Sequence, residues 1–297
     1  MSDTKITAAM VKQLRDTTGS PMMECKKALS ETGGDVDAAC EWLRKNSLAK
    51  VDKRASKTAA EGVVVMAVSD NAHYAGMVEI NCETDFVAKD AGFMAFAKAV
   101  EAAIIAHQPN SLEALMSCSS TSAEVDGSFE DWRCQLAAKV GENIQMRRFA
   151  SIASDDTYVA GYQHGVRIGV LAQLNVNNQE LAKDVCMHIA ATNPSAIDAS
   201  EVPAATLATE REVYLAQAQQ SGKPEDIINK MVEGRIQKFL KENTLLGQPF
   251  VKNPEQTVAK LLGQHQAQVM SFTRYEVGEG IEVEVKDFAQ EVMEQLK

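Results

Sequence analysis

The chain has 297 residues, of which 45% are apolar and 24% charged, a composition typical of a globular protein of two or three domains. Its net charge of −11 argues against a direct nucleic-acid partner. No apolar run reaches the roughly 18 residues of a transmembrane helix, so no membrane partner is expected. The N-terminus lacks a charged-then-apolar secretory pattern, which predicts a cytoplasmic protein.

Residues 1–55 are predicted to form an N-terminal domain of three helices. An apolar stripe that includes Leu14 ends at Gly19, Ser20-Pro21 is typical of a helix start, and Asp35 is expected to cap a third helix. Residues 1–58 carry a net charge of +3 against −14 for the rest, which favours a separate module with its own contacts. The lysine- and alanine-rich stretch after the third helix, "AKVDKRASKTAAEG", is predicted to be a linker.

The core is predicted to contain two copies of one α+β unit. Two β-rich runs around Ser69-Asp70-Asn71 predict a hairpin, followed by a helix from about Phe93 and a strand in "NIQMRRFASIA". A second strand pair, "YVAGYQHGVRIGVLAQLN", precedes "LAKDVCMHIAATNP", which matches "FAKAVEAAIIAHQP" at six of fourteen positions, and "VMSFTRYEV" supplies a late strand. The predicted fold class is therefore α+β, with antiparallel sheets in repeated subdomains at residues 56–150 and 151–286.

The first copy has nine extra residues between its second strand and its helix, essentially the stretch "ETDFVAKDAG". The fold does not need this loop, because the second copy lacks it. The loop carries Phe86, an aromatic residue among charged neighbours such as Glu83 and Asp90. An apolar tip on a dispensable loop is better explained by binding than by packing.

Two further helical segments are predicted in the C-terminal half. Residues 204–244 read as an αα-hairpin inserted into the second subdomain, broken by "SGKP" and with a narrow apolar stripe on its second helix. Residues 287–297, within "DFAQEVMEQLK", predict a C-terminal helix.

No convergent set of catalytic or metal-binding groups is apparent in the sequence. Cys186 and His188 lie two positions apart on a helix and should point to different faces. The six cysteines are scattered without a Cys-x-x-Cys pair and are expected to be reduced, mostly buried thiols. We therefore expect no cofactor, no metal site and no enzymatic activity.

The helix that begins at Met22 has one unexpected apolar residue. Met22, Cys25, Ala28 and Leu29 should share one face, whereas Met23 falls nearly opposite them. An isolated exposed methionine is often only a surface residue. Methionine is also adaptable at binding surfaces, and this one lies in the basic module.

Two long, irregular motifs resemble those of the elongation factor Ts family, the bacterial guanine-nucleotide exchange factors of elongation factor Tu. They are "LRDTTGSPMMECKKAL" (Leu14–Leu29) and "EINCETDFVAK" (Glu79–Lys89). "YQHGVRIGVL", "SGKP", "KMVEGR", "GQPFV" and "RYEVGEGIE" follow in the family's order, so the resemblance covers essentially the whole chain. It implies a ubiquitin-associated-like N-terminal domain, a core of two repeated subdomains and an inserted helical hairpin.

The resemblance also implies a function and a set of site residues. The partner would be elongation factor Tu, a protein GTPase. The loop residues Thr84, Asp85, Phe86 and Val87 would enter it near its magnesium site, and Phe86 would dislodge Mg²⁺ and promote GDP release during protein synthesis. Further partner contacts are implied for Arg15, Met22 and Met23 of the N-terminal domain and for His164 of the second subdomain.

Two other classes of function remain open from the sequence. The three-helix module could serve a plain adaptor of ubiquitin-like partners. Cys82, next to the loop, could serve a thiol-dependent enzyme. Release of labelled GDP from elongation factor Tu separates the first interpretation from both alternatives, and retained activity after Cys82→Ser would dismiss the enzyme.

Overall fold

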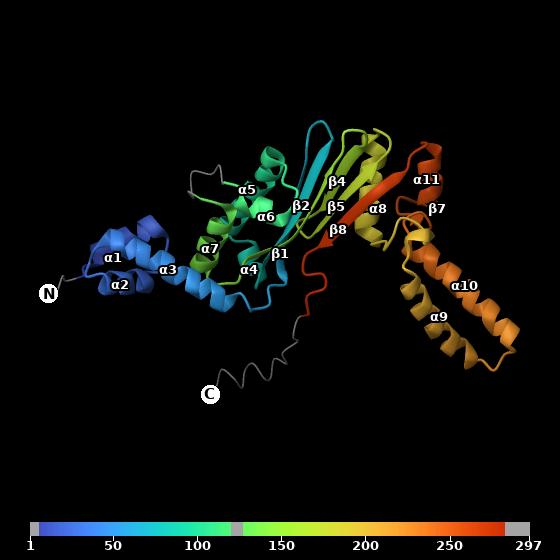
Figure 1. Ribbon diagram of the computed structural model, residues 1–297, viewed down its shortest axis with the longest axis horizontal. Coiled ribbons are helices and arrows are strands. Elements are labelled where there is room, and N and C mark those ends of the chain that lie inside the picture. The colour runs from blue at the N-terminus through green and yellow to red at the C-terminus, as the bar shows by residue number, and fades with distance from the viewer. Residues whose placement is uncertain (1–5, 120–126, 283–297) are drawn as a thin grey trace. The chain divides into compact units, whose positions relative to one another are not determined.

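The computed structural model describes residues 6–119 and 127–282 (Figure 1). The described residues fall into two compact units. The first comprises residues 6–65, 78–119, 127–149 and 276–282, and the second comprises Met66–Met77 and Ala150–Tyr275. Each unit is described separately below.

Three helices form the N-terminal part of the first unit: α1 (Ala8–Thr18), α2 (Met22–Glu31) and α3 (Val36–Arg54). They enclose a small core of Val11, Leu14, Cys25, Ala28, Leu29, Ala39 and Leu43. Gly19 ends α1 with a positive φ of 67°, a conformation that glycine adopts without steric cost. The predicted linker is partly wrong, because α3 continues through it to Arg54. Lysine and alanine favour helix, and neither glycine nor proline interrupts this stretch before Gly62.

The rest of the first unit contains strand residues and the helices that flank the Phe86 segment. The three-stranded sheet has the order β1-β2-β3, formed by β1 (Glu61–Val68), β2 (Tyr74–Cys82) and β3 (Gln145–Ala153). The helices are α4 (Asp85–Ala88), α5 (Ala91–His107), α6 (Leu112–Ser117) and α7 (Phe129–Val140). Phe96 of α5 packs edge-on against Phe129 and Trp132 of α7, with ring centroids 6.1 and 5.5 Å away. This aromatic contact fixes α5 and α7 against each other.

The second unit is built on a sheet with the order β4-β5-β8, formed by β4 (Tyr158–His164), β5 (Ile168–Leu174) and β8 (Val269–Glu276). Strands β4 and β5 pair antiparallel from Tyr158 opposite Leu174 to His164 opposite Ile168. Helix α8 (Gln179–Thr192) packs on both strands, and its Val185 and Ile189 are fully buried in the shared core. Smaller elements, not predicted, follow the hairpin: β6 (Pro249–Phe250), β7 (Asn253–Thr257) and α11 (Val258–Gln264).

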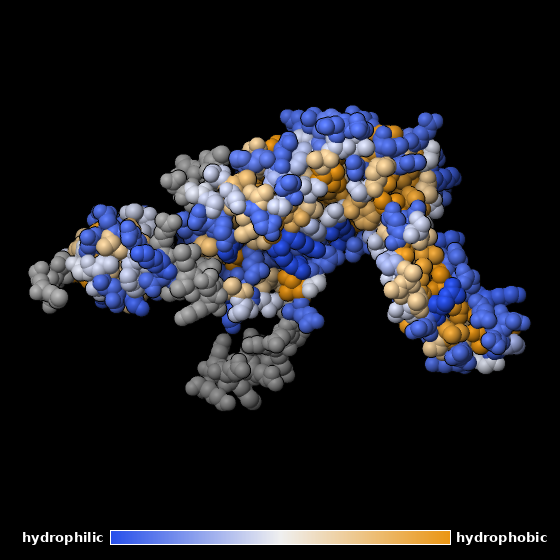
Figure 2. All heavy atoms as spheres, in the orientation of Figure 1, coloured by the Kyte–Doolittle hydropathy of each residue, from blue (hydrophilic) through white to orange (hydrophobic). Residues whose placement is uncertain are grey.

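The helical hairpin of the second unit consists of α9 (Ala204–Gln219) and α10 (Glu225–Asn243), which pack side by side (Figure 1). A 3-10 turn, η1 (Ala199–Glu201), precedes it. The hairpin has its own small core, in which Ala218, Ile228, Val232 and Ile236 are buried. Figure 2 shows apolar side chains along this hairpin, where Val213 and Ile227 are among the exposed large apolar residues.

The α+β fold class is confirmed: helices and antiparallel sheets occur together, with a helical region at the N-terminus. The domain boundaries remain predictions. The C-terminal helix expected at residues 287–297 lies outside the described residues. Within residues 6–119 and 127–282, no helix is both long and apolar enough to span a membrane.

Candidate functional site

The candidate site is centred on Phe86, whose side chain is 81% exposed. No other large apolar side chain among the described residues has so great an exposed fraction. The segment is not the open loop that the sequence suggested, because Asp85–Ala88 forms one helical turn, α4. Phe86 therefore lies on a defined turn and contributes little to any core.

Helix α4 is closed at its start by Thr84. The Thr84 hydroxyl accepts a hydrogen bond from the Val87 backbone N–H at 3.3 Å, and the Thr84 carbonyl accepts one from Ala88 at 3.2 Å. At the other end, the Asp90 carboxylate accepts bonds from the N–H groups of Gly92 and Phe93 and so begins α5. These caps satisfy backbone donors that a helix start would otherwise leave without partners.

Two carboxylates hold the segment that leads into α4. The Glu142 carboxylate accepts hydrogen bonds from the backbone N–H groups of Glu83 and Thr84, at 3.1 and 3.0 Å, and from the Thr84 hydroxyl at 2.7 Å. In return, the Glu83 carboxylate accepts a bond from the Asn143 N–H at 2.7 Å. Residues 83–84 and 142–143 thus each supply a carboxylate to the other's backbone.

Arg54, at the end of α3, also binds the Glu83 carboxylate, with its Nε 2.9 Å from Oε1. Burial by itself would raise the pKa of Glu83, but the hydrogen bonds from Arg54 and Asn143 bring that pKa below its ordinary value. The half-buried Glu83 side chain is therefore held ionised near neutral pH.

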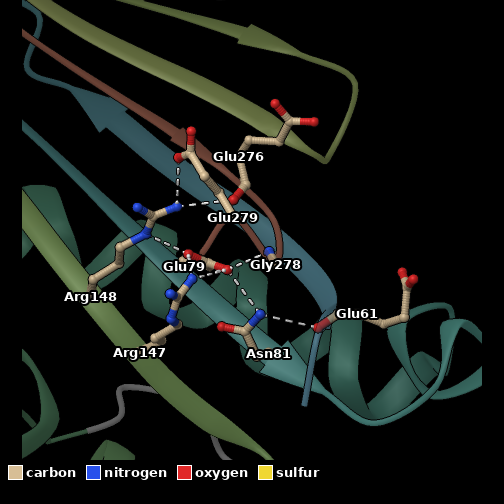
Figure 3. A network of polar contacts seen from close by, with 8 residues as sticks. All are labelled: Glu61, Glu79, Asn81, Arg147, Arg148, Glu276, Gly278 and Glu279. Carbon is tan, nitrogen blue, oxygen red and sulfur yellow. Dashed lines mark hydrogen bonds and ion pairs between the residues drawn. The ribbon is translucent and has the colours of Figure 1, made fainter. Parts of the chain in front are cut away.

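A buried ion network is centred on Glu79 of β2, the strand that precedes the Phe86 turn (Figure 3). The Glu79 side chain of β2 is fully buried and accepts bonds from Arg147 and Arg148 of β3, the latter at 2.5 Å. It also accepts bonds from Asn81 and from the backbone N–H of Gly278. Burial raises the pKa of Glu79, but the hydrogen bonds from Gly278, Asn81 and Arg148 and the charge of Arg148 outweigh it and lower the pKa.

Arg148 extends this network to the segment after β8. Its Nη2 lies 2.9 Å from the Glu276 carbonyl oxygen and 3.3 Å from the Glu279 carboxylate (Figure 3). The strand that leads to Phe86 and the segment at residues 276–279 are therefore joined through one buried carboxylate.

Cys82 is the only cysteine beside α4 in the described residues, and its side chain is fully buried. Its Sγ donates to the Thr84 carbonyl at 3.2 Å, and burial raises its pKa to about 12. A thiol held protonated in this way is a poor nucleophile. Half of the six free cysteines are buried (Cys25, Cys82 and Cys186), fewer than the expected "mostly". Outside residues 1–5, 120–126 and 283–297, no cluster of His, Cys, Asp and Glu is suited to a metal ion.

The N-terminal site residues lie on α1 and α2. Arg15 is exposed on α1, and Met23 is 74% exposed at the start of α2. Met22, which was expected on the same face as Cys25, Ala28 and Leu29, is 50% exposed, whereas those three residues are fully buried. Met22 is the first residue of α2 and precedes by about one turn the buried residues Cys25, Ala28 and Leu29.

His164 is the last residue of β4, in the second unit, and its side chain is exposed. Its Nδ1 lies 3.1 Å from the Tyr162 hydroxyl, two residues earlier on the same strand. The structure thus brings Thr84, Asp85, Phe86 and Val87 together on one turn, and it places Arg15, Met22 and Met23 on two adjacent helices.

Sequence reasoning missed the residues that hold the Phe86 turn. Glu142 lies 59 positions from Glu83, and no spacing or period connects the two. Gly141, which ends α7 with a φ of 75°, does indicate where the chain reverses. It does not indicate which backbone groups the following carboxylate reaches.

Comparison with known proteins places the chain in a family. Residues 83–279 match the family described as elongation factor TS. The elongation factor Ts of Thioalkalivibrio sulfidiphilus (strain HL-EbGR7) is 54% identical over 293 residues, which are 98% of this chain and 99% of the relative. That of Methylococcus capsulatus (strain ATCC 33009 / NCIMB 11132 / Bath) is 52% identical over 292 residues, again 98% and 99%. The chain belongs to the elongation factor Ts family.

Proposed function

We propose that the chain is a guanine-nucleotide exchange factor that binds elongation factor Tu in the cytoplasm and promotes GDP release. The supporting observation is Phe86, which is 81% exposed on a turn whose backbone is held by caps and carboxylates. An aromatic side chain held this far out of its own protein is suited to a pocket of another.

The remaining proposed contacts come from the other exposed site residues. Arg15, Met22 and Met23 form the N-terminal contact, and His164 forms a contact from the second unit. Phe86 and its neighbours Thr84, Asp85 and Val87 enter the GTPase near its Mg²⁺. Phe86 displaces partner side chains there, and the disturbance releases the metal.

Exchange of this kind needs no covalent chemistry. A factor that binds the nucleotide-free GTPase more tightly than the GDP form must weaken GDP binding by the same factor. Mg²⁺ offsets phosphate charge in GTPases, so its release removes part of the nucleotide's affinity. The protonated, buried Cys82 gives no support to the alternative of a thiol enzyme.

The test is release of labelled GDP from elongation factor Tu in excess unlabelled nucleotide, with the chain present in substoichiometric amount. An exchange factor turns over, so a small amount should release GDP from the whole GTPase population. An adaptor would bind the GTPase without changing the release rate, and that result would refute the proposal.

A further inference from the structure

We propose that Glu142 is a positioning residue for exchange, which holds the Phe86 turn in the orientation that the partner accepts. The inference rests on the proposed function and adds to it a residue outside the "TDFV" motif. It starts from the clamp in which Glu142 accepts three hydrogen bonds from two consecutive residues, Glu83 and Thr84.

The first step concerns the Thr84 hydroxyl, which has one proton and two lone pairs. An ionised carboxylate can only accept, so this hydroxyl donates its proton to Glu142 Oε1, 2.7 Å away. The hydroxyl oxygen is then free to accept from the Val87 N–H. Glu142 therefore selects the hydroxyl orientation that caps α4, the turn that carries Phe86.

The second step concerns what holds Glu142. It follows Gly141, the residue that caps the C-terminal end of α7, and α7 is fixed to α5 by the aromatic contacts of Phe96. Asn143, next in the chain, is buried, and its side chain donates to the carbonyls of Ala55 and Lys57. Glu142 thus reaches the turn from a segment that is itself fixed on both sides.

The third step concerns the conformational entropy that the turn loses when it binds. A flexible turn would lose conformational entropy when Phe86 enters a pocket, and that loss would weaken binding. The clamp orders the turn before the encounter, so the free energy of Phe86 burial is available to distort the partner. Removal of the clamp should leave Phe86 present but poorly oriented.

The experiment is a double-mutant cycle with Glu142→Ala and Phe86→Ala, read as acceleration of GDP release from elongation factor Tu. Glu142→Ala should slow exchange about fivefold when Phe86 is present, since a helix cap is worth about this factor in an equilibrium. In the Phe86→Ala background, the same change should have less than about a twofold effect. Equal losses in both backgrounds would show that Glu142 acts independently of Phe86 and would overturn the proposal.

A second measurement needs no partner. Amide hydrogen exchange of Val87 and Ala88 in the free chain should be about fivefold faster in Glu142→Ala than in the unmodified chain. Unchanged protection of these amides would overturn the role of Glu142 while leaving the proposed function intact. Equal GDP release by the unmodified chain and Phe86→Ala would overturn the proposed insertion of Phe86 into the partner and, with it, the role of Glu142.

Two further variants separate positioning from a general loss of structure. Glu142→Gln keeps a carbonyl for the two backbone N–H groups but no longer accepts from the Thr84 hydroxyl, so it should recover part of the exchange rate. Asp198→Ala removes a carboxylate that accepts from the N–H and hydroxyl of Ser200 in the second unit. It should leave GDP release unchanged, and a loss as large as that of Glu142→Ala would overturn the assignment.

Discussion

Replacement of Phe86 by alanine should separate partner binding from folding. Complete burial of a phenylalanine contributes about 1.5–3 kcal/mol relative to an exposed one. Phe86 is 81% exposed, so only about a fifth of that term is at stake in the free chain. Phe86→Ala should therefore change the free energy of unfolding by about 0.5 kcal/mol or less.

The same substitution should have a much larger effect on exchange. An aromatic anchor in a desolvated pocket is often worth about 2 kcal/mol or more, which corresponds to roughly a thirtyfold loss of rate. The assay is GDP release from elongation factor Tu in magnesium, with unfolding of each variant followed in parallel. Phe93→Ala is the matched control, because Phe93 is fully buried on α5 and its loss should cost about 3–5 kcal/mol of stability.

A chelator tests whether Phe86 acts on the metal. With EDTA present the Mg²⁺ is already gone, so the unmodified chain and Phe86→Ala should release GDP at more similar rates. An unchanged rate of GDP release for Phe86→Ala in magnesium would refute the proposed insertion of Phe86 into the partner. A large loss that persisted equally in EDTA would keep Phe86 as an anchor but reject metal displacement.

Three other predictions concern parts of the chain away from this turn. Met23→Ala should cost well under the roughly 2–5 kcal/mol expected for the buried Leu29→Ala, and a comparable stability loss would place Met23 in the core. Replacement of residues 206–238 by a short Gly/Ser bridge should leave cooperative melting, because the hairpin packs on its own apolar residues, and its absence would make the hairpin part of the core. Burial raises the pKa of Glu79, but its hydrogen bonds lower it overall, so its contribution to stability is present above about pH 4.3 and declines as the pH falls further. Glu79→Gln should thus lower the unfolding free energy at pH 7 by about 1–3 kcal/mol. It should also make the unfolding free energy depend less on pH in the acid range, and denaturant titrations at pH 7 and below about pH 4.3 would check this.

The sequence predicts most of the helices and strands because local chemistry determines them. Gly19 ends α1 and the apolar period of α8 selects its buried face, and both signals lie within a few residues of the feature they predict. The linker prediction was wrong as far as Arg54, because charged, alanine-rich segments are equally compatible with a coil and a helix. Short elements such as α4 and α11 also escaped, since one or two turns carry too few residues to show a period.

The same distinction between local and long-range signals applies to the candidate site. Phe86 could be singled out because an aromatic residue among charges is anomalous wherever the chain folds. Its supports could not, because Glu142 and Arg54 are ordinary charged residues whose partners become neighbours only in the folded chain. A residue's chemistry can thus be read locally, whereas its orientation depends on contacts between distant segments.

In the proposed exchange mechanism, rigidity at the base of the turn and exposure at its tip would serve the same thermodynamic requirement. An exchange factor gains only from interactions that favour the nucleotide-free partner over the GDP form. If Phe86 packed against its own chain, part of its burial energy would already be used in folding and would be unavailable to the complex. If the turn were disordered, part of that burial energy would be offset by the entropy lost when the turn becomes ordered. The hydrogen bonds of Thr84 and Glu142 would avoid the second loss without causing the first, because they hold the backbone and the hydroxyl of Thr84 and leave the aromatic ring of Phe86 exposed.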